Sequence, residues 1–229
     1  DTLVNEYFDA WDLLGTNKKV SFLYTSGVDG VVLSGMVTEK AGERGYTVVD
    51  PGRFPDGTKD FTALISQIKQ ESCDIVVGAL PTPDFSVAWK QFHQMGYIPK
   101  IVTMGITLQL ISDLEALGGD LGLGLTYSQM WNENYPYRSS LFGKNCNEWA
   151  QQWIDETGKW PNLTLGIDSC VLETAIDALK RAQSVDKEKI RAALEDTDME
   201  TLSGHIKYND EHVAETTIVI AQWTKGTTW

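Results

Sequence analysis

The chain has 229 residues, of which 42% are hydrophobic and 22% charged, and this is the composition of an ordinary globular protein. Its formal net charge of -13 argues against nucleic acid or an anionic membrane as a partner, because both call for clustered Lys and Arg. No apolar run approaches the roughly 20 residues that a membrane-spanning helix needs, and no signal peptide is visible. We expect one large domain or two small ones.

A helix is predicted at the start, where apolar residues recur at helical spacing from Thr2 to Leu14 and Gly15 ends the pattern. Apolar runs and helical patterns then alternate. The predicted strands are Lys19–Thr25, Tyr46–Val49, Cys73–Leu80, Ile101–Met104 and Leu123–Tyr127. The predicted helices are Val31–Arg44, one after Asp60, Asp84–Met95 and Leu108–Leu117. This alternation predicts βαβ units in a doubly wound parallel sheet of about five strands, with helices on both faces.

The most regular segment of this pattern is Phe54–Lys69. Pro55, Asp56 and Gly57 favour a turn, because Pro presets its backbone angle and Gly accepts a positive one. Thr58 or Asp60 is then expected to cap the helix that follows. That helix has one apolar stripe.

The pattern changes after Tyr127. The segment Trp131–Tyr137 is aromatic, polar and broken by Pro136, so it is typical of a crossing segment. Three helices without intervening strands and then two strands are predicted: Lys144–Thr157, Leu165–Ala182 and Asp186–Leu194, then His205–Tyr208 and Thr216–Thr224. A turn at Asn209–Asp210 is expected between the two strands.

The three cysteines cannot all pair within one chain. Cys73 lies at the edge of a buried strand and Cys170 in a helical pattern, so core packing explains both. A Cys146–Cys170 bridge is the alternative in an oxidising compartment. Neither Cys-x-x-Cys nor His-x-x-x-His spacing occurs, and we expect no structural metal and no cofactor.

Segments along almost the whole chain resemble one family, the branched-chain amino acid (Leu/Ile/Val) type of periplasmic substrate-binding protein of ABC transporters, which has the two-lobed type I fold. The matching segments are Lys19–Val20 with Tyr24 and Gly30; Phe54–Phe61 with Ile65 and Ile68–Lys69; Asp74–Gly78; Lys90–Gln91 with Gly96; Gly158–Lys159 with Pro161, Asp168 and Ala175–Leu179; Lys189–Leu194; and Gly204–Asp210. No single motif decides the match, but their order does.

The resemblance implies an α/β fold made of the family's second lobe and of helices returning to an incomplete first lobe. The implied division is 1–135 for the second lobe with its entry helix, 136–213 for the returning, mostly helical part of the first lobe and 214–229 for a closing strand back in the second lobe. The first-lobe sheet that precedes this part in the family is absent, which favours a fragment over a natural short form. Apolar side chains of the returning helices are therefore expected to be exposed, which predicts dimerisation, rearrangement or a missing partner fragment. These side chains are Trp149, Trp153, Ile154, Leu172, Ile176 and Leu179.

The function that the resemblance implies is solute binding without chemistry. The chain is expected to belong to a periplasmic or extracellular component of an ABC importer, with or without a lipid anchor. It would capture a small organic ligand, an amino acid or a related amide or aromatic acid, between two lobes and deliver it to a membrane permease. The alternative is a ligand-sensing domain of a receptor with the same fold.

Ligands of open α/β sheets bind beyond the carboxyl ends of the strands, and this rule selects four loops. Their candidate ligand-binding residues are Ser26, Asp29, Leu80, Pro81, Thr82, Gly105, Thr107, Ser128 and Trp131. The family often has an aromatic residue at the Asp29 position and a carboxylate for the ligand's ammonium near Thr107. Here the acidic residue is Asp29, so either Asp29 recognises an ammonium or the ligand is not an α-amino acid.

Other interpretations of these side chains stay open. Asp29 also suits a helix N-cap, and Thr107 also suits a cap of the helix that follows it. Trp131 suits stacking on an apolar ligand or packing at a hinge.

Enzyme classes have weaker support. The three histidines fall on a predicted helix, strand and turn, and none has a Ser or Cys arranged as its nucleophile. No phosphate loop occurs, and the glycines at 118–124 precede a strand, whereas a dinucleotide fingerprint follows one. No nucleophile elbow is found. We therefore expect a binding protein.

Overall fold

The structure, a computed structural model, describes residues 2–225, and these divide into two compact units. Unit 1 consists of residues 2–128 and 219–225, and unit 2 of residues 129–218. The division expected from the resemblance was at 135/136 and 213/214, so 129–135 and 214–218 fall in unit 2 here. Residue 1 and residues 226–229 lie outside the described part.

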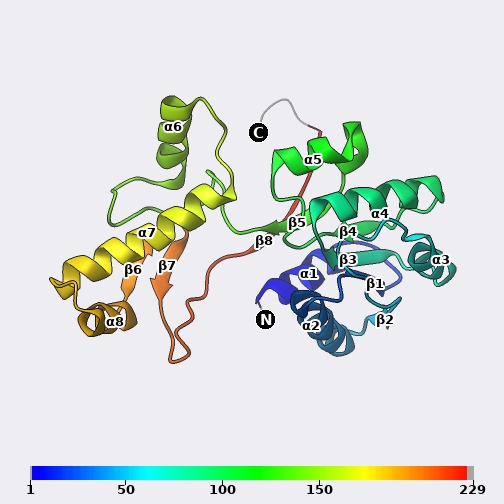
Figure 1. The fold of residues 1–229 in the computed structure, drawn as a ribbon, viewed down its shortest axis with the longest axis horizontal. Coiled ribbons are helices and arrows are strands. Elements are labelled where there is room, and N and C mark those ends of the chain that lie inside the picture. Colours follow the sequence, from blue (N-terminus) through cyan, green and yellow to red (C-terminus); the bar gives the residue numbers. More distant parts are fainter. Residues whose placement is uncertain (1, 226–229) are drawn as a thin grey trace. The chain divides into compact units, whose positions relative to one another are not determined.

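Unit 1 is built on a six-stranded sheet in the order β2-β1-β3-β4-β5-β8 (Figure 1). The pairs β1–β2, β1–β3, β3–β4 and β4–β5 are all parallel, as the sequence predicted. The strand bounds are β1 Lys19–Tyr24, β2 Thr47–Val49, β3 Ile75–Ala79, β4 Ile101–Thr103, β5 Thr126–Gln129 and β8 Val219–Gln222. The chain is therefore an α/β protein with a doubly wound sheet.

Helices cover both faces of this sheet, and each face has its own apolar core. Helices α1 and α2 bury Phe8, Trp11 and Val37 against one face, while α3 and α4 bury Ile65 and Phe92 against the other. Figure 1 shows α4 and α5 above the strands. The bounds are α1 Thr2–Asp12, α2 Val28–Arg44, α3 Thr62–Gln70, α4 Thr82–Gln94, α5 Ile111–Leu117 and the short 3₁₀ helix η1 Gly119–Gly122.

The turn before α3 is held by a buried carboxylate. Gly57, with a φ of +80°, donates its backbone N–H to Asp84 of α4 at 2.7 Å. Asp84 is only 3% exposed. Asp60 accepts the backbone N–H of Thr62 at 2.9 Å, so it satisfies one of the free amides at the start of α3.

Unit 2 contains the helices α6 Cys146–Thr157, α7 Leu163–Ala182 and α8 Lys187–Glu195 and a two-stranded sheet of β6 Asp198–Thr201 and β7 Gly204–Lys207. The sequence analysis missed β6. Strand β7 pairs antiparallel with β6, and β8 joins the sheet of unit 1.

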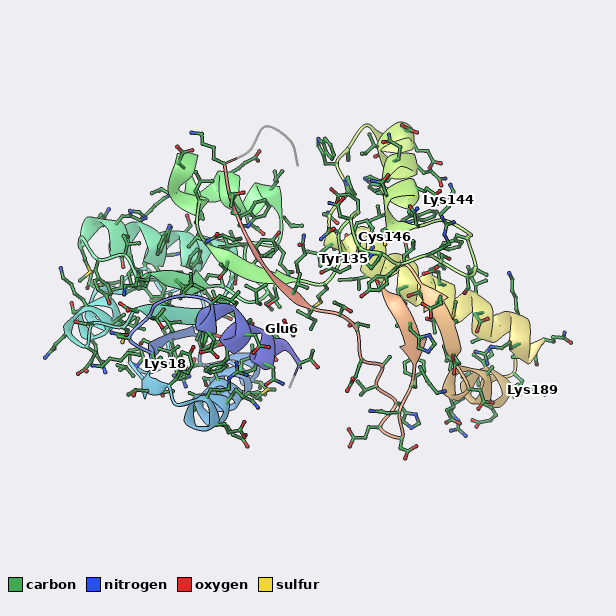
Figure 2. All side chains as sticks on the ribbon, turned by 180° about the vertical axis from the view of Figure 1, so that it is seen from behind. Glu6, Lys18, Tyr135, Lys144, Cys146 and Lys189 are labelled. Carbon is green, nitrogen blue, oxygen red and sulfur yellow. The ribbon has the colours of Figure 1, made fainter. Side chains whose placement is uncertain are left out.

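Glu173 of α7 holds the hairpin turn between β6 and β7. Its carboxylate is fully buried and accepts the backbone N–H of Leu202 at 3.0 Å. The thiol of Cys146, the first residue of α6 (Figure 2), donates to the carbonyl of the same Leu202 at 3.2 Å. Cys73, Cys146 and Cys170 are all free thiols, so the alternative of a Cys146–Cys170 bridge is not realised.

The returning helices expose part of their apolar surface. Trp153, Leu172 and Leu179 are exposed, whereas Trp149, Ile154 and Ile176, for which exposure was also expected, are half-buried. Within residues 2–225, no helix combines the length and the apolar composition that crossing a bilayer would require.

Burial raises the pKa of the Glu173 carboxyl above its ordinary value. Its neutral form therefore stabilises the folded state, and this contribution is complete below the unfolded pKa of about 4.3 and is lost as pH rises through the folded pKa. We predict that Glu173→Gln, which cannot ionise, gains unfolding free energy relative to the wild type as pH rises from 5 to 8. Urea unfolding across this range measures the difference. Glu211→Gln, at an exposed position, is the control; parallel curves for Glu173→Gln and the wild type would contradict the prediction.

Candidate ligand-binding site

The strand order places a topological switch point between β1 and β3. From β1 the chain moves outward to β2, and from β3 it moves the other way to β4 and β5, so the connections diverge at this point. Ligands of open α/β sheets bind beyond the carboxyl ends of the strands at such a point. The loops after β1 and after β3 flank it, and the loop after β4 is the next neighbour.

The loop after β1 ends in the first turn of α2. Ser26 donates its backbone N–H to the carbonyl of Phe54 at 2.7 Å, which ties this loop to the segment after β2. Gly27 is the N-cap of α2, and no side chain caps the helix. Asp29 lies in its first turn, so the interpretation of Asp29 as the N-cap was wrong. Its side chain is exposed and has no hydrogen bond or ion pair to the residues that the structure describes.

The loop after β3 enters α4 directly. Leu80 is 7% exposed, and Pro81, the N-cap residue of α4, is exposed. Thr82 is half-buried and donates its hydroxyl to Asp113 at 3.0 Å. The polar group of Thr82 is therefore already paired within unit 1.

Thr107, after β4, is 4% exposed and bonds twice to Leu80. Its hydroxyl accepts the backbone N–H of Leu80 at 3.2 Å and donates to the carbonyl of Leu80 at 2.7 Å. It does not cap a helix, as one interpretation held: α5 begins at Ile111 with Leu110 as N-cap, and Asp113 accepts the N–H of Leu110.

Two tyrosine hydroxyls lie buried in unit 1, on the face of the sheet that α1 covers. Burial raises the pKa of Tyr7 and of Tyr24, so both hydroxyls stay neutral. Ser128, fully buried at the end of β5, donates to the Tyr7 hydroxyl at 3.4 Å. A side chain at Gly105 would place its Cβ 2.8 Å from that same hydroxyl, and Gly105 has a φ of +31°. Position 105 therefore accepts only glycine without rearrangement.

Trp131 lies in unit 2, whereas the other candidates lie in unit 1. Its side chain is 1% exposed and packs in an apolar cluster with Cys146, Ala150 and Leu202. A Cβ at Gly166 of α7 would lie 2.1 Å from the indole ring, so the ring rests directly on the α7 backbone. In this structure the ring is a core element of unit 2.

Sequence reasoning did not single out two exposed apolar side chains at the same edge of the sheet. Val28, after β1, is 79% exposed and Ile106, after β4, is 53% exposed. Together with Pro81, they place one exposed apolar side chain just beyond the carboxyl end of each of three neighbouring strands. An apolar residue inside a polar loop directly after a buried strand was the signal that could have identified them. The edge thus offers apolar surface and the carboxylate of Asp29.

The predicted site residues do not line two surface cavities found elsewhere in the described residues. These cavities, of about 840 and 350 Å³, lie in unit 2, on α6 and between α8 and the segment after β7. Within residues 2–225, no three His, Cys, Asp or Glu side chains gather as a metal ion would need.

Comparison with known proteins shows the family. Residues 1–228 match the family model described as "Periplasmic binding protein", and the chain belongs to this family. It is 23% identical over 218 residues, 91% of the chain, to the Leu/Ile/Val-binding protein homolog 8 of Brucella abortus. The match covers 53% of that protein, so the chain spans about half the length of the curated relatives it matches.

Solved structures agree on the fold. The leucine-binding protein LivK of Thermotoga maritima superposes with a TM-score of 0.85 at 21% identity, over 99% of this chain and 63% of its own. The branched-chain amino acid binding protein LivJ of Streptococcus pneumoniae, solved in complex with isoleucine, gives a TM-score of 0.71 at 14% identity, over 90% of this chain and 57% of its own.

Two glycines of α2 allow a matched test of how the loop after β1 is fixed. A Cβ at Gly30 would lie 2.1 Å from the carbonyl oxygen of Thr25, whereas a Cβ at Gly35 would meet nothing within 4 Å. We predict that Gly30→Ala lowers the unfolding free energy by about 1–3 kcal/mol through overpacking. Gly35→Ala should raise it by up to about 1 kcal/mol, because Ala favours a helix over Gly. Urea unfolding followed by circular dichroism compares them, and equal effects would refute the close packing.

Proposed function

We propose that this chain is the ligand-binding part of an extracytoplasmic component of an ABC importer. It captures a small organic ligand, an amino acid or a close derivative, at the carboxyl edge of the unit 1 sheet and performs no chemistry on it. Membership of the periplasmic binding protein family supports this proposal, as do the fold neighbours whose names refer to branched-chain amino acids. The partner that receives the ligand is a membrane permease.

The observation that carries the proposal is the unpaired carboxylate of Asp29 at the switch point. A ligand ammonium moving from water to a protein surface needs an opposite charge, or it loses hydration without compensation. Asp29 is exposed and has no charged partner among the described residues. It also follows Val28, which supplies exposed apolar surface beside the charge.

The other contacts of the proposed site come from its loops. Pro81 and Ile106 supply apolar surface from the loops after β3 and β4. The hydroxyl of Ser26 is exposed at the end of β1 and is available for a hydrogen bond. The backbone N–H and carbonyl of Leu80 are both bonded to Thr107, so Leu80 is not expected to bond the ligand. This division of roles suits a ligand that has an ammonium at one end and an aliphatic or aromatic group at the other.

The proposal is tested by nuclear magnetic resonance titration of the ¹⁵N-labelled chain, which detects binding in the millimolar range. The probes are L-isoleucine, 2-methylbutylamine, which keeps its ammonium and lacks its carboxylate, and 3-methylpentanoate, which lacks the ammonium. We expect L-isoleucine and the amine to shift the amides of residues 26–30, of Leu80 and Thr82 and of residues 105–107, and 3-methylpentanoate to leave them in place.

Asp29→Asn isolates the charge in this experiment. Hydrogen bonds to charged groups contribute about 1.5–3 kcal/mol, so its affinity for the two ammonium probes should fall roughly tenfold or more. Glu39→Gln, which removes an exposed carboxylate from the same helix, should bind as the wild type does. Unchanged binding by Asp29→Asn would refute the role of Asp29, and shifts confined to other regions would refute the site.

A further inference from the structure

We infer that Thr107 and Asp113 are positioning residues, which fix the loops after β3 and β4 as one rigid wall of the ligand site without contacting the ligand themselves. That these loops form a ligand site rests on the proposed function. The hydrogen bonds that join the two loops are present in the chain without any ligand. Thr107 is thus assigned a role different from the ligand contact that the sequence suggested.

Thr107 continues the connection between β3 and β4 beyond the end of their ladder. The last paired residues of these strands are Val77 and Thr103. Leu80 lies three residues after Val77, and Thr107 lies four residues after Thr103. The two bonds between the Thr107 hydroxyl and the backbone of Leu80 therefore lie beyond the paired part of the strands. Beyond the ends of the strands, the Thr107 side chain therefore joins the two chain segments as a pair of backbone hydrogen bonds does inside the sheet.

These two bonds and the burial of Thr107 leave it poorly suited to contact a ligand. A hydroxyl has one donor, and that donor is given to the Leu80 carbonyl at 2.7 Å. One of its two acceptor lone pairs receives the Leu80 N–H, and the residue is only 4% exposed. A ligand that competed for this hydroxyl would leave the buried N–H or carbonyl of Leu80 without a partner, which costs free energy.

Asp113 makes the second link between the same loops. One carboxylate oxygen accepts the hydroxyl of Thr82, in the first turn of α4, at 3.0 Å. The other accepts the backbone N–H of Leu110, just before α5, at 3.0 Å. The two helix starts, and with them Pro81 and the loop that carries Ile106, are held at a fixed spacing by this one side chain.

The loop after β1 is not part of this wall. It is bonded to the segment after β2 through Ser26 and Phe54, and no hydrogen bond joins residues 25–29 to residues 80–82 in the part of the chain that the structure describes. The edge of the sheet thus consists of two blocks that meet at the switch point. Pre-ordering of a block reduces the entropy that binding would otherwise cost.

The link is tested first without any ligand, by hydrogen exchange of backbone amides. Thr107→Val keeps the shape of the side chain and removes the hydroxyl, so the Leu80 amide should exchange about tenfold faster, as expected for the loss of one hydrogen bond. Thr107→Ser restores the hydroxyl and should return exchange to within about twofold of the wild type. Thr174→Val removes another buried threonine hydroxyl, which bonds only within α7, and should leave Leu80 unchanged.

Asp113→Ala provides an independent variant in case Thr107→Val fails to fold. It should speed exchange at the Leu110 amide and leave the Leu80 amide protected by Thr107. Unchanged exchange at Leu80 in a folded Thr107→Val chain, or at Leu110 in Asp113→Ala, would overturn the corresponding link whatever the chain binds.

The role in binding is tested next with L-isoleucine as the probe. Thr107→Val should weaken its binding about fivefold to tenfold, and Thr107→Ser should recover the wild-type affinity, while Thr174→Val has no effect. A loosened Leu80 amide with unchanged affinity would overturn the positioning role. Absence of binding by the wild-type chain to all three probes would refute the proposed function, and the exchange experiment would still decide whether the two loops are joined.

Discussion

The pairing of β1 with β3 is the constraint on which unit 1 depends. Five residue pairs, from Val20–Ile75 to Tyr24–Ala79, join the two strands. Their approach is so close at Gly78 that a Cβ there would lie 2.2 Å from the Leu23 carbonyl oxygen. Because β3 pairs with β1 and not with β2, the two directions of winding meet at this pair. The same contact therefore joins both apolar cores and creates the switch point beyond its carboxyl end.

Much of this architecture was predictable because it follows from local patterns. A buried parallel strand is a short apolar run, and each crossover helix has an apolar stripe, so five strands of unit 1 were found from periodicity. Strand β6 has neither signal: Asp198 and Glu200 alternate with Met199 and Thr201, and two acidic residues in four suggest a loop. These acidic side chains are matched by Lys207 and His205 on β7, a cross-strand pairing that periodicity cannot detect.

The candidate site was predictable as a set of loops but not as a set of accessible groups. The rule that ligands bind beyond the carboxyl ends of the strands needs only the positions of the strands. The alternation of strand and helix patterns in the sequence supplied these positions. Whether a given side chain points to solvent depends on partners far along the chain. Thr107 is buried because of Leu80, and Trp131 because of Gly166 on α7. Asp29 is exposed for the opposite reason, since Gly27 takes the N-cap position and leaves the carboxylate unused.

If the proposed site binds its ligand, the two blocks of the sheet edge would divide the tasks of recognition between them. The block formed by the loops after β3 and β4 is cross-linked by buried side-chain bonds and presents Pro81 and Ile106, so its contribution is shape. The block formed by the loop after β1 presents the carboxylate of Asp29, so its contribution is charge. Shape selects only when the surface cannot adapt, because a loose loop accommodates many side chains. Charge tolerates looser geometry, since its energy falls slowly with distance. The hydrogen bonds of Thr107 and Asp113 thus lie on the side of the switch point where, in the proposed site, rigidity would improve discrimination.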